Sequence, residues 1–379
     1  MVSTAPIYDG WIVPDGVFDG QTLLRDHAVR VDDGKVVDLQ SGQDGQRVRG
    51  IVTPGFFDLQ VNGGDGVLLN TTPTRDGAAA IARAHANLGT AGCLPTLITD
   101  VPDVLDKVAA AFLSAPLPEH VLGLHIEGPH ISVARKGTHN PALVRPLDQR
   151  TFDIVGRLRD RDIPVLMTVA PEAVVPGQIQ ALTRMGAVIS LGHSDCVAAD
   201  ANAGFAEGAS LVTHLFNGMS QMHGRAPGMV GAALCSDAYV SIICDGIHVH
   251  PDMVGLAFRS RPVPDRMILV SDAMPTVGGP DSFDLYGNRI TLRGGTLLNA
   301  EGALAGAHLT MLEAVQFTVS AAGIDLQTAL RAAISNPAQV MGLSGHFSLL
   351  NGAEPYVLTP DWAMQSMAGA GAAEPVIQD

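Results

Sequence analysis

Histidines and a carboxylate stand at the ends of several short apolar runs, where a parallel sheet would bring them together. Glu127 ends the run VLGLHIE, His193 ends AVISLGH, and His214 lies in SLVTHLF. Two imidazoles and one carboxylate make a three-ligand site for a divalent ion with room for water, the composition of a catalytic zinc-type centre. Such an ion lowers the pKa of bound water and polarises a carbonyl group. These residues therefore predict a hydrolytic metal centre.

Asp272 ends another apolar run, RMILVSD, and adds a carboxylate with a different role. Next to the three ligands it is placed to take a proton from water and to pass it to a departing amine. A single histidine or acid at the end of a strand is more often a hydrogen-bonded structural residue. Four such residues at the ends of separate strands rarely arise by chance, so the hypothesis depends on the whole set.

Eight short apolar runs are expected to carry these residues as β-strands. Stretches with helical apolar spacing, such as residues 76–89 and 151–161, alternate with them. This alternation indicates an α/β fold with a (β/α)8 TIM-like barrel, in which the loops that follow the strands converge on the site. No GxGxxG follows an early strand, which argues against a dinucleotide-binding sheet. The expected strands are 56–61, 93–99, 121–127, 163–169, 187–193, 210–216, 239–245 and 266–272.

The two ends of the chain have a different character. Residues 1–52 hold short alternating runs separated by Gly and Asp turns, and the β-pattern returns between Phe347 and Val357. We expect residues 1–52 and 346–379 to form a small β-sandwich domain and residues 53–345 to form the barrel. Hairpin-like alternation predicts a β-hairpin insertion at about 281–305, followed by helices at 308–322 and 327–335.

Composition excludes several classes of protein. Hydrophobic residues make up 46% of the chain and charged residues only 16%, which is typical of a compact globular protein. A net charge of −15 argues against a nucleic-acid groove or a polybasic membrane patch. The sequence shows no signal peptide and no apolar run long enough for a membrane span. Four cysteines without a CxxC pair fit a cytoplasmic protein.

Two further features suggest binding groups. In the stretch PGFFDLQVNGG, Gln60 and Asn62 lie on the same side of an expected strand, where two amides need hydrogen-bond partners. They are either polar residues satisfied by nearby loops or part of a site. In the loop GRAPG, Arg225 is suited to a phosphate or carboxylate, although a lone loop arginine is more often only solvated.

The motifs, in this order, resemble those of the N-acetylglucosamine-6-phosphate deacetylases, a family of the amidohydrolase superfamily. The match covers roughly residues 54–343, and its most specific part is HIEGP with GTHNP, followed by HLFNGM with GRAPG. The resemblance implies a distorted barrel with a small β-domain built from both chain ends, and a homodimer. It implies hydrolysis of the acetamide of N-acetylglucosamine 6-phosphate to acetate and the amino sugar phosphate. After Val357 the family's final strand is not evident.

The resemblance also assigns roles to individual residues. The metal ligands fall on Glu127, His193 and His214, and the catalytic carboxylate falls on Asp272. Arg225, supplied by the other subunit of the dimer, and His248 would bind the 6-phosphate. The implied substrate contacts are Thr138, His139, Asn217, Gly218, Arg225, His248 and the backbone of Leu304, Ala305 and Gly306.

Gln60 and Asn62 gain meaning from this resemblance. Much of the superfamily has a His-x-His pair at this place, which binds one metal of a two-metal centre. Amides are poor ligands for a zinc-like ion beside imidazole and carboxylate, so we expect one divalent ion per subunit. Zinc is the expected metal, with iron, cobalt or manganese as alternatives. Gln60 and Asn62 would instead hydrogen-bond water, substrate or the metal ligands.

Three alternatives remain open at this point. The substrate can be N-acetylgalactosamine 6-phosphate, which differs in the orientation of one hydroxyl group. Another amidohydrolase, such as a cyclic-amide hydrolase or a deaminase, often carries a bridging lysine on the fourth strand, but IPVLMTV has none. A non-catalytic barrel that serves as a protein-binding scaffold would be expected to have lost metal ligands or the acid.

Overall fold

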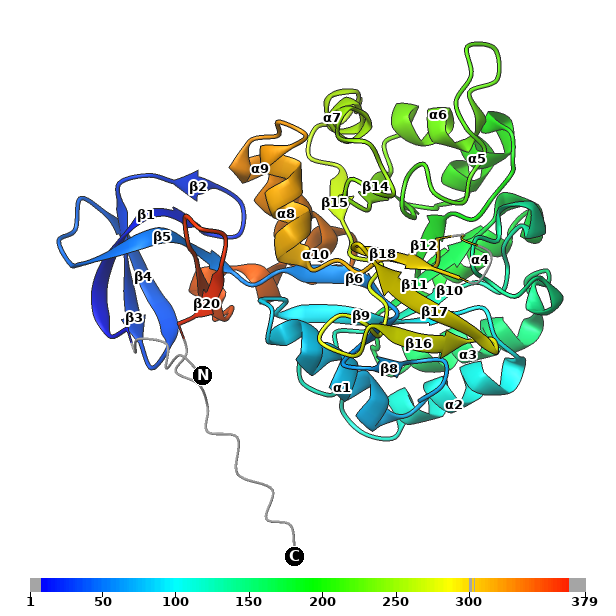
Figure 1. The fold of residues 1–379 in the computed structure, drawn as a ribbon, viewed down its shortest axis with the longest axis horizontal. Helices are drawn as coiled ribbons and strands as arrows, with labels where there is room; N and C mark the ends of the chain where they lie inside the picture. The colour runs from blue at the N-terminus through cyan, green and yellow to red at the C-terminus, as the bar shows by residue number, and fades with distance from the viewer. Residues whose placement is uncertain (1–7, 300–301, 303, 368–379) are drawn as a thin grey trace, which may run out of the picture.

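The computed structural model describes residues 8–299, 302 and 304–367. Most of these residues form a parallel eight-stranded sheet that curves into a barrel, with helices around it (Figure 1). The strands are paired in the order of the sequence, and each overlaps one of the eight apolar runs, so the expected barrel is confirmed. The strands are β6 (Phe57–Val61), β9 (Gly92–Ile98), β10 (Leu124–Glu127), β11 (Val165–Val169), β12 (Val188–Leu191), β13 (Leu211–Val212), β14 (Tyr239–Ile242) and β15 (Met267–Leu269).

A narrow seam joins the first and last strands of the barrel. Val61 and Ala273 form a single parallel bridge, and the backbone N–H of Asn62 donates to the carbonyl oxygen of Ala273 at 2.9 Å. Asp58 on β6 accepts hydrogen bonds from the backbone N–H and the hydroxyl group of Ser271. Burial raises the pKa of Asp58 to about 7. The seam therefore holds Asn62 against the segment that begins at Ser271.

Helices cover the outside of the barrel, and several of them begin at side-chain caps. The side chains of Thr74 and Asp148 accept backbone hydrogen bonds at the start of α1 and α3, and Thr310 with Glu313 forms a capping box at α8. The helices are α1 (Arg75–Ala86), α2 (Pro102–Leu113), α3 (Gln149–Arg159), α4 (Gln178–Arg184), α5 (Ala198–Ala206), α6 (Gly228–Cys235), α7 (Pro251–Arg259) and α8 (Met311–Ser320). Short 3-10 turns lie at η1 (Val133–Arg135), η2 (Pro141–Leu143), η3 (Pro171–Ala173), η5 (Ser344–Phe347) and η6 (Leu349–Asn351).

The last helical segment extends beyond the expected end at residue 335. Here α9 (Leu326–Leu330) continues through a π-helical turn, η4 (Arg331–Ser335), into α10 (Asn336–Val340). Pro337 lacks the amide hydrogen that an α-helix would use, and the wide turn just before it accommodates this loss. The helix end predicted at residue 335 is therefore wrong.

Both ends of the chain contribute to a separate β-domain, as expected, and Figure 1 shows it beside the barrel. Its seven strands are joined in one sheet, in which β5 pairs in parallel with β1 and antiparallel with β19. A final strand does follow Val357, because a turn after Leu358 folds β20 back onto β19. Residues 1–7 and 368–379 lie outside the described part. The strands are β1 (Gly10–Phe18), β2 (Leu23–Leu24), β3 (His27–Asp32), β4 (Lys35–Ser41), β5 (Gln46–Pro54), β19 (Pro355–Leu358) and β20 (Met364–Ser366).

The insertion after the last barrel strand is a three-stranded antiparallel sheet where a hairpin was expected. It contains β16 (Ser282–Leu285), β17 (Asn288–Arg293) and β18 (Thr296–Leu298). Gly294 and Gly295, both with positive φ, make the second turn. A small hairpin of β7 (Gly63–Gly64) and β8 (Val67–Leu68) lies at the end of β6. Within the described residues, no helix is long and apolar enough to cross a membrane.

Candidate active site

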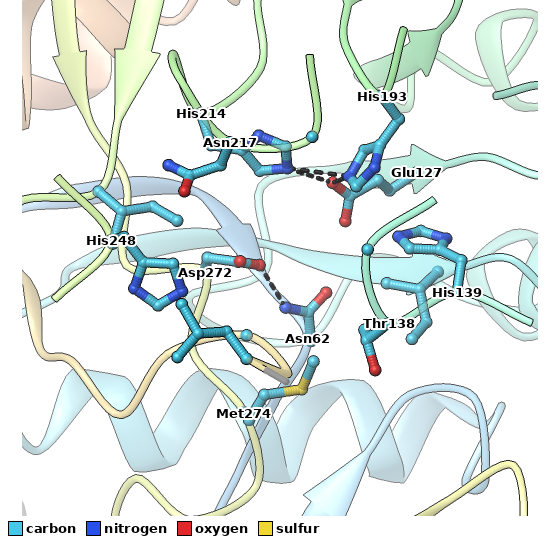
Figure 2. A pocket seen from close by; sticks show the side chains of 16 residues that line it. Asn62, Glu127, Thr138, His139, His193, His214, Asn217, His248, Asp272 and Met274 are labelled. Carbon is cyan, nitrogen blue, oxygen red and sulfur yellow. Dashed lines mark hydrogen bonds and ion pairs between the residues drawn. The ribbon is translucent and has the colours of Figure 1, made fainter. Parts of the chain in front are cut away.

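A cavity at the carboxyl ends of the barrel strands brings the predicted residues together (Figure 2). Its volume is about 150 Å³. Polar side chains of six barrel strands or the loops after them point into it. The lining residues are Asn62, Ile98, Glu127, Gly137, Thr138, His139, His193, His214, Asn217, Gly218, Ile243, His248, Asp272, Met274, Leu304 and Gly306.

Glu127, His193 and His214 meet at one point of this cavity. Oε1 of Glu127 lies 3.1 Å from Nε2 of His193 and 3.0 Å from Nε2 of His214, and the two nitrogens are 3.0 Å apart. All three side chains are almost completely buried. Burial alone would raise the pKa of Glu127, but the hydrogen bonds from the two histidines outweigh it and hold the pKa well below its usual value.

The spacing and chemistry of these three atoms fit a divalent metal ion. Nδ1 of His193 donates to the carbonyl oxygen of Arg135 at 2.9 Å, so in the neutral ring Nε2 carries the lone pair that a metal ion binds. A metal ion would replace the proton through which Nε2 is hydrogen-bonded to Glu127. Tetrahedral zinc with ligand distances of about 2.0–2.2 Å separates its ligand atoms by about 3.3 Å. Only a small adjustment of the observed cluster is needed.

His139 is a rival for one of the ligand positions. Together with Glu127 and His193 it also offers three donor atoms within 4.8 Å of one another. However, Nδ1 of His139 accepts the backbone N–H of Thr99 at 3.3 Å, so the ring carries its proton on Nε2. Burial and the neighbouring His193 lower the pKa of His139 to about 3. A neutral ring with Nε2–H is a hydrogen-bond donor, which favours His214 as the third ligand.

Three of the site residues have unusual backbone conformations. His193, His214 and Asp272 have φ values of +47°, +31° and +52°, in the region that residues with a Cβ rarely adopt. Each lies two or three residues after the end of its strand, where the chain turns and the side chain points into the cavity. Strain of this kind is concentrated at functional sites because the surrounding structure must maintain it.

Two amides hold one oxygen of Asp272. Oδ1 accepts hydrogen bonds from Nε2 of Gln60 at 3.0 Å and from Nδ2 of Asn62 at 2.7 Å. The same nitrogen of Gln60 also donates to Oε1 of Glu127 at 2.9 Å, so Gln60 links the two carboxylates. Burial and the charge of Glu127 raise the pKa of Asp272 to about 6. Within the described chain no side chain binds Oδ2, which remains available to a ligand.

The other predicted contacts divide into two groups. Thr138, Asn217, Gly218, Leu304 and Gly306 line the cavity, as expected. His248 also lines it, and its Nδ1 donates to Oδ2 of Asp245 at 2.6 Å, which leaves Nε2 for a ligand. Gln60 and Ala305 are buried behind the lining, and Arg225 is exposed on a loop outside it.

Sequence reasoning missed the apolar part of the cavity. Ile98, Ile243 and Met274 form its hydrophobic wall together with Leu304. Ile98 and Ile243 end or follow apolar strands, and Met274 lies two residues after Asp272, so their positions at the strand ends were the available signal. Asp245 is the last residue of the expected strand 239–245, but its hydrogen bond with His248 appears only in the structure.

Comparison with known proteins places the chain in a family. The model of the amidohydrolase family matches residues 51–351. The chain is 37% identical to N-acetylgalactosamine-6-phosphate deacetylase of Shewanella sp. (strain ANA-3), with 88% of each chain covered. It is 33% identical to N-acetylglucosamine-6-phosphate deacetylase of Haemophilus influenzae, with 82% and 80% covered.

A solved structure agrees with these sequence matches. The crystal structure of N-acetylglucosamine-6-phosphate deacetylase from Pasteurella multocida superposes with a TM-score of 0.86 at 30% identity, covering 94% of this chain and 96% of the other. The similarity extends over the barrel and the terminal domain, and the resemblance inferred from the sequence motifs is confirmed. The chain belongs to the amidohydrolase family and, within it, to the N-acetylhexosamine-6-phosphate deacetylases.

Proposed function

We propose that this protein hydrolyses the acetamide of N-acetylglucosamine 6-phosphate to glucosamine 6-phosphate and acetate, using one divalent metal ion. The main observation behind the proposal is that Asp272 lines the same cavity as Glu127, His193 and His214. The activities named for its relatives support the choice of substrate. The place of the reaction is the breakdown or recycling of amino sugars.

Glu127, His193 and His214 would hold the metal ion. When bound there, a divalent ion supplies Lewis-acid polarisation of a carbonyl group and lowers the pKa of water. Imidazole and carboxylate ligands suit zinc, and iron, cobalt and manganese are also compatible. Gln60 and Asn62 have their NH2 groups directed at carboxylates, so they do not offer a second ligand set. One ion per subunit follows.

The chain's own residues then move the protons. Oδ2 of Asp272 accepts a proton from the attacking water and delivers it to the departing amine, because Oδ1 is already held by Gln60 and Asn62. The Nε2–H of His139 donates a hydrogen bond to the carbonyl oxygen as negative charge builds on it. Burial of the cavity strengthens both interactions.

The remaining cavity residues would bind the sugar and its phosphate. Nε2 of His248 faces the ligand, oriented by Asp245, while Thr138, Asn217, Gly218 and the 304–306 backbone supply polar contacts. Leu304, Ile98, Ile243 and Met274 provide an apolar surface for the sugar ring and the acetyl methyl group.

Arg225 would reach the phosphate in a homodimer. It lies in the exposed loop of residues 221–227, just before α6, and this loop projects from the barrel (Figure 1). Arg225 does not line the cavity of its own subunit. Mixing Arg225→Ala and Asp272→Asn subunits tests this. Each mixed dimer would contain one intact site, so about one quarter of wild-type activity returns from two inactive proteins. Absence of recovery contradicts the shared site.

Acetate release with metal analysis tests the main proposal. The purified protein should contain about one metal ion per chain and release acetate from N-acetylglucosamine 6-phosphate. Asp272→Asn should keep the metal and lose turnover, and near-native activity of this variant would remove Asp272 from proton transfer. If neither metal nor acetate release is found, the chain is a non-catalytic scaffold.

N-acetylgalactosamine 6-phosphate is the second candidate substrate. The observation that favours it is the 37% identity to the Shewanella enzyme of that name. Competition between the two sugar phosphates in one assay gives the ratio of their kcat/KM values and decides between them. We place the reaction in the cytoplasm, which the free thiols of Cys93, Cys196, Cys235 and Cys244 support.

A further inference from the structure

Asn62 has a side-chain orientation that the structure defines. Its Nδ2 lies 2.7 Å from Oδ1 of Asp272, and a carboxylate oxygen can only accept there. Oδ1 of Asp272 also accepts from Gln60, so a proton on Asp272 would sit on Oδ2 and leave this contact unchanged. The NH2 group of Asn62 therefore faces Asp272, and its carbonyl oxygen must face the opposite way, into the cavity (Figure 2).

The carbonyl oxygen of Asn62 has no partner. Asn62 is 0% exposed, and none of the described residues donates a hydrogen bond to its Oδ1. A buried acceptor without a donor destabilises the protein. Such an atom at the wall of a binding cavity indicates a donor that arrives with the ligand.

The position of Asp272 limits which donor this can be. To deliver a proton to the departing amine, Asp272 must lie within hydrogen-bond reach of the substrate nitrogen. Asn62 Oδ1 belongs to the same amide group whose nitrogen binds Asp272, so it lies beside that reaction point. The substrate nitrogen carries one N–H bond, which needs an acceptor once the substrate is buried.

We propose that Oδ1 of Asn62 accepts a hydrogen bond from the N–H of the substrate's acetamide and so selects N-acyl over O-acyl groups. This inference rests on the proposed deacetylase function. The nitrogen gains positive charge when Asp272 protonates it, so its N–H becomes a stronger donor during the reaction. The contact with Asn62 is then stronger in the transition state than in the ground state, which is the condition for a gain in rate.

A substrate analogue separates this role from support of Asp272. The 2-O-acetyl ester of glucose 6-phosphate has the same shape but lacks the N–H. In Asn62→Ala, loss of the bond to Asp272 slows both substrates, whereas loss of Oδ1 slows only the amide. We expect the ratio of kcat/KM for amide over ester to fall roughly tenfold relative to wild type. Equal losses for both substrates would overturn the inference.

Two controls keep the test independent of folding and of the proposed function. Thr138→Val removes another polar group of the cavity and should leave the amide-to-ester ratio unchanged. Calorimetry on wild-type protein stripped of metal needs no variant, and there the N-acetyl sugar phosphate should bind more tightly than its O-acetyl analogue. Equal affinities also overturn the inference. If the wild-type protein releases no acetate from the amide at all, the proposed function itself fails.

Discussion

The seam of the barrel contains a carboxyl group whose removal should change the pH dependence of stability. Asp58 is fully buried, and its carboxylate accepts from the N–H groups of Gln60 and Ser271 and from the Ser271 hydroxyl. Burial is nevertheless the largest effect and raises the pKa from 3.8 to about 7. In Asp58→Asn the amide oxygen can keep the backbone hydrogen bonds, and its NH2 can donate to the Ser271 hydroxyl.

The sign and size of the effect follow from the raised pKa. The folded protein binds this proton more tightly than the unfolded chain, so the free energy of unfolding falls as the pH rises from about 4 to about 7. A shift of about three pKa units corresponds to about 4 kcal/mol. We therefore compare the free energy of unfolding of Asp58→Asn with that of wild type. The value for Asp58→Asn minus the value for wild type should rise by up to about 4 kcal/mol from pH 4 to pH 8.

Urea unfolding of both proteins at several pH values measures this difference. Titrating groups far from Asp58 contribute equally to both proteins and cancel when the two are subtracted. Asp281→Asn, which removes an exposed carboxylate, controls for the change in net charge. A difference between wild type and Asp58→Asn that stays constant from pH 4 to pH 8 would refute the reasoning.

Three further predictions concern the metal, the ligand contact and the backbone. Glu127→Gln should lower the metal content well below one ion per chain, as elemental analysis would show, because it removes the anionic ligand from the cluster. Asp245→Ala should raise KM for the sugar phosphate roughly tenfold while metal content is retained, because His248 loses the acceptor that orients it. Gly20→Ala should cost about 3 kcal/mol in unfolding free energy, since its Cβ would lie 2.3 Å from the carbonyl oxygen of Phe347, whereas Gly42→Ala meets no atom within 4 Å and should cost about 1 kcal/mol.

Local sequence patterns were sufficient to predict the barrel and most of its chemistry. Each strand is a short apolar run bounded by turn residues, and the polar residue at its carboxyl end is exposed to the site by the topology. For this reason Glu127, His193, His214 and Asp272 could be assigned to one cavity before their distances were known.

Features that depend on distant contacts were not predictable in the same way. The orientation of Asn62 is determined by Asp272, which is 210 positions away in the chain. The tautomer of His139 depends on the backbone of Thr99. The helix predicted to end at residue 335 continues through the π-helical turn Arg331–Ser335 into α10. Arg225 lies outside the cavity of its own subunit, so the phosphate contact proposed for it requires a second subunit.

The terminal β-domain has a consequence for synthesis of the protein. Thr53 on β5 pairs with Tyr356 on β19. During synthesis, this edge of β5 therefore has no partner strand until about 300 more residues have been made. At about 5–20 residues per second, this edge stays open for about 15–60 s on the ribosome. An open edge strand can pair with another chain, and the charges of Arg47 and Arg49 oppose such pairing. If synthesis stops before β19, the barrel is therefore attached to a sheet of five of its seven strands with an unpaired edge at β5, the form of this protein most exposed to aggregation.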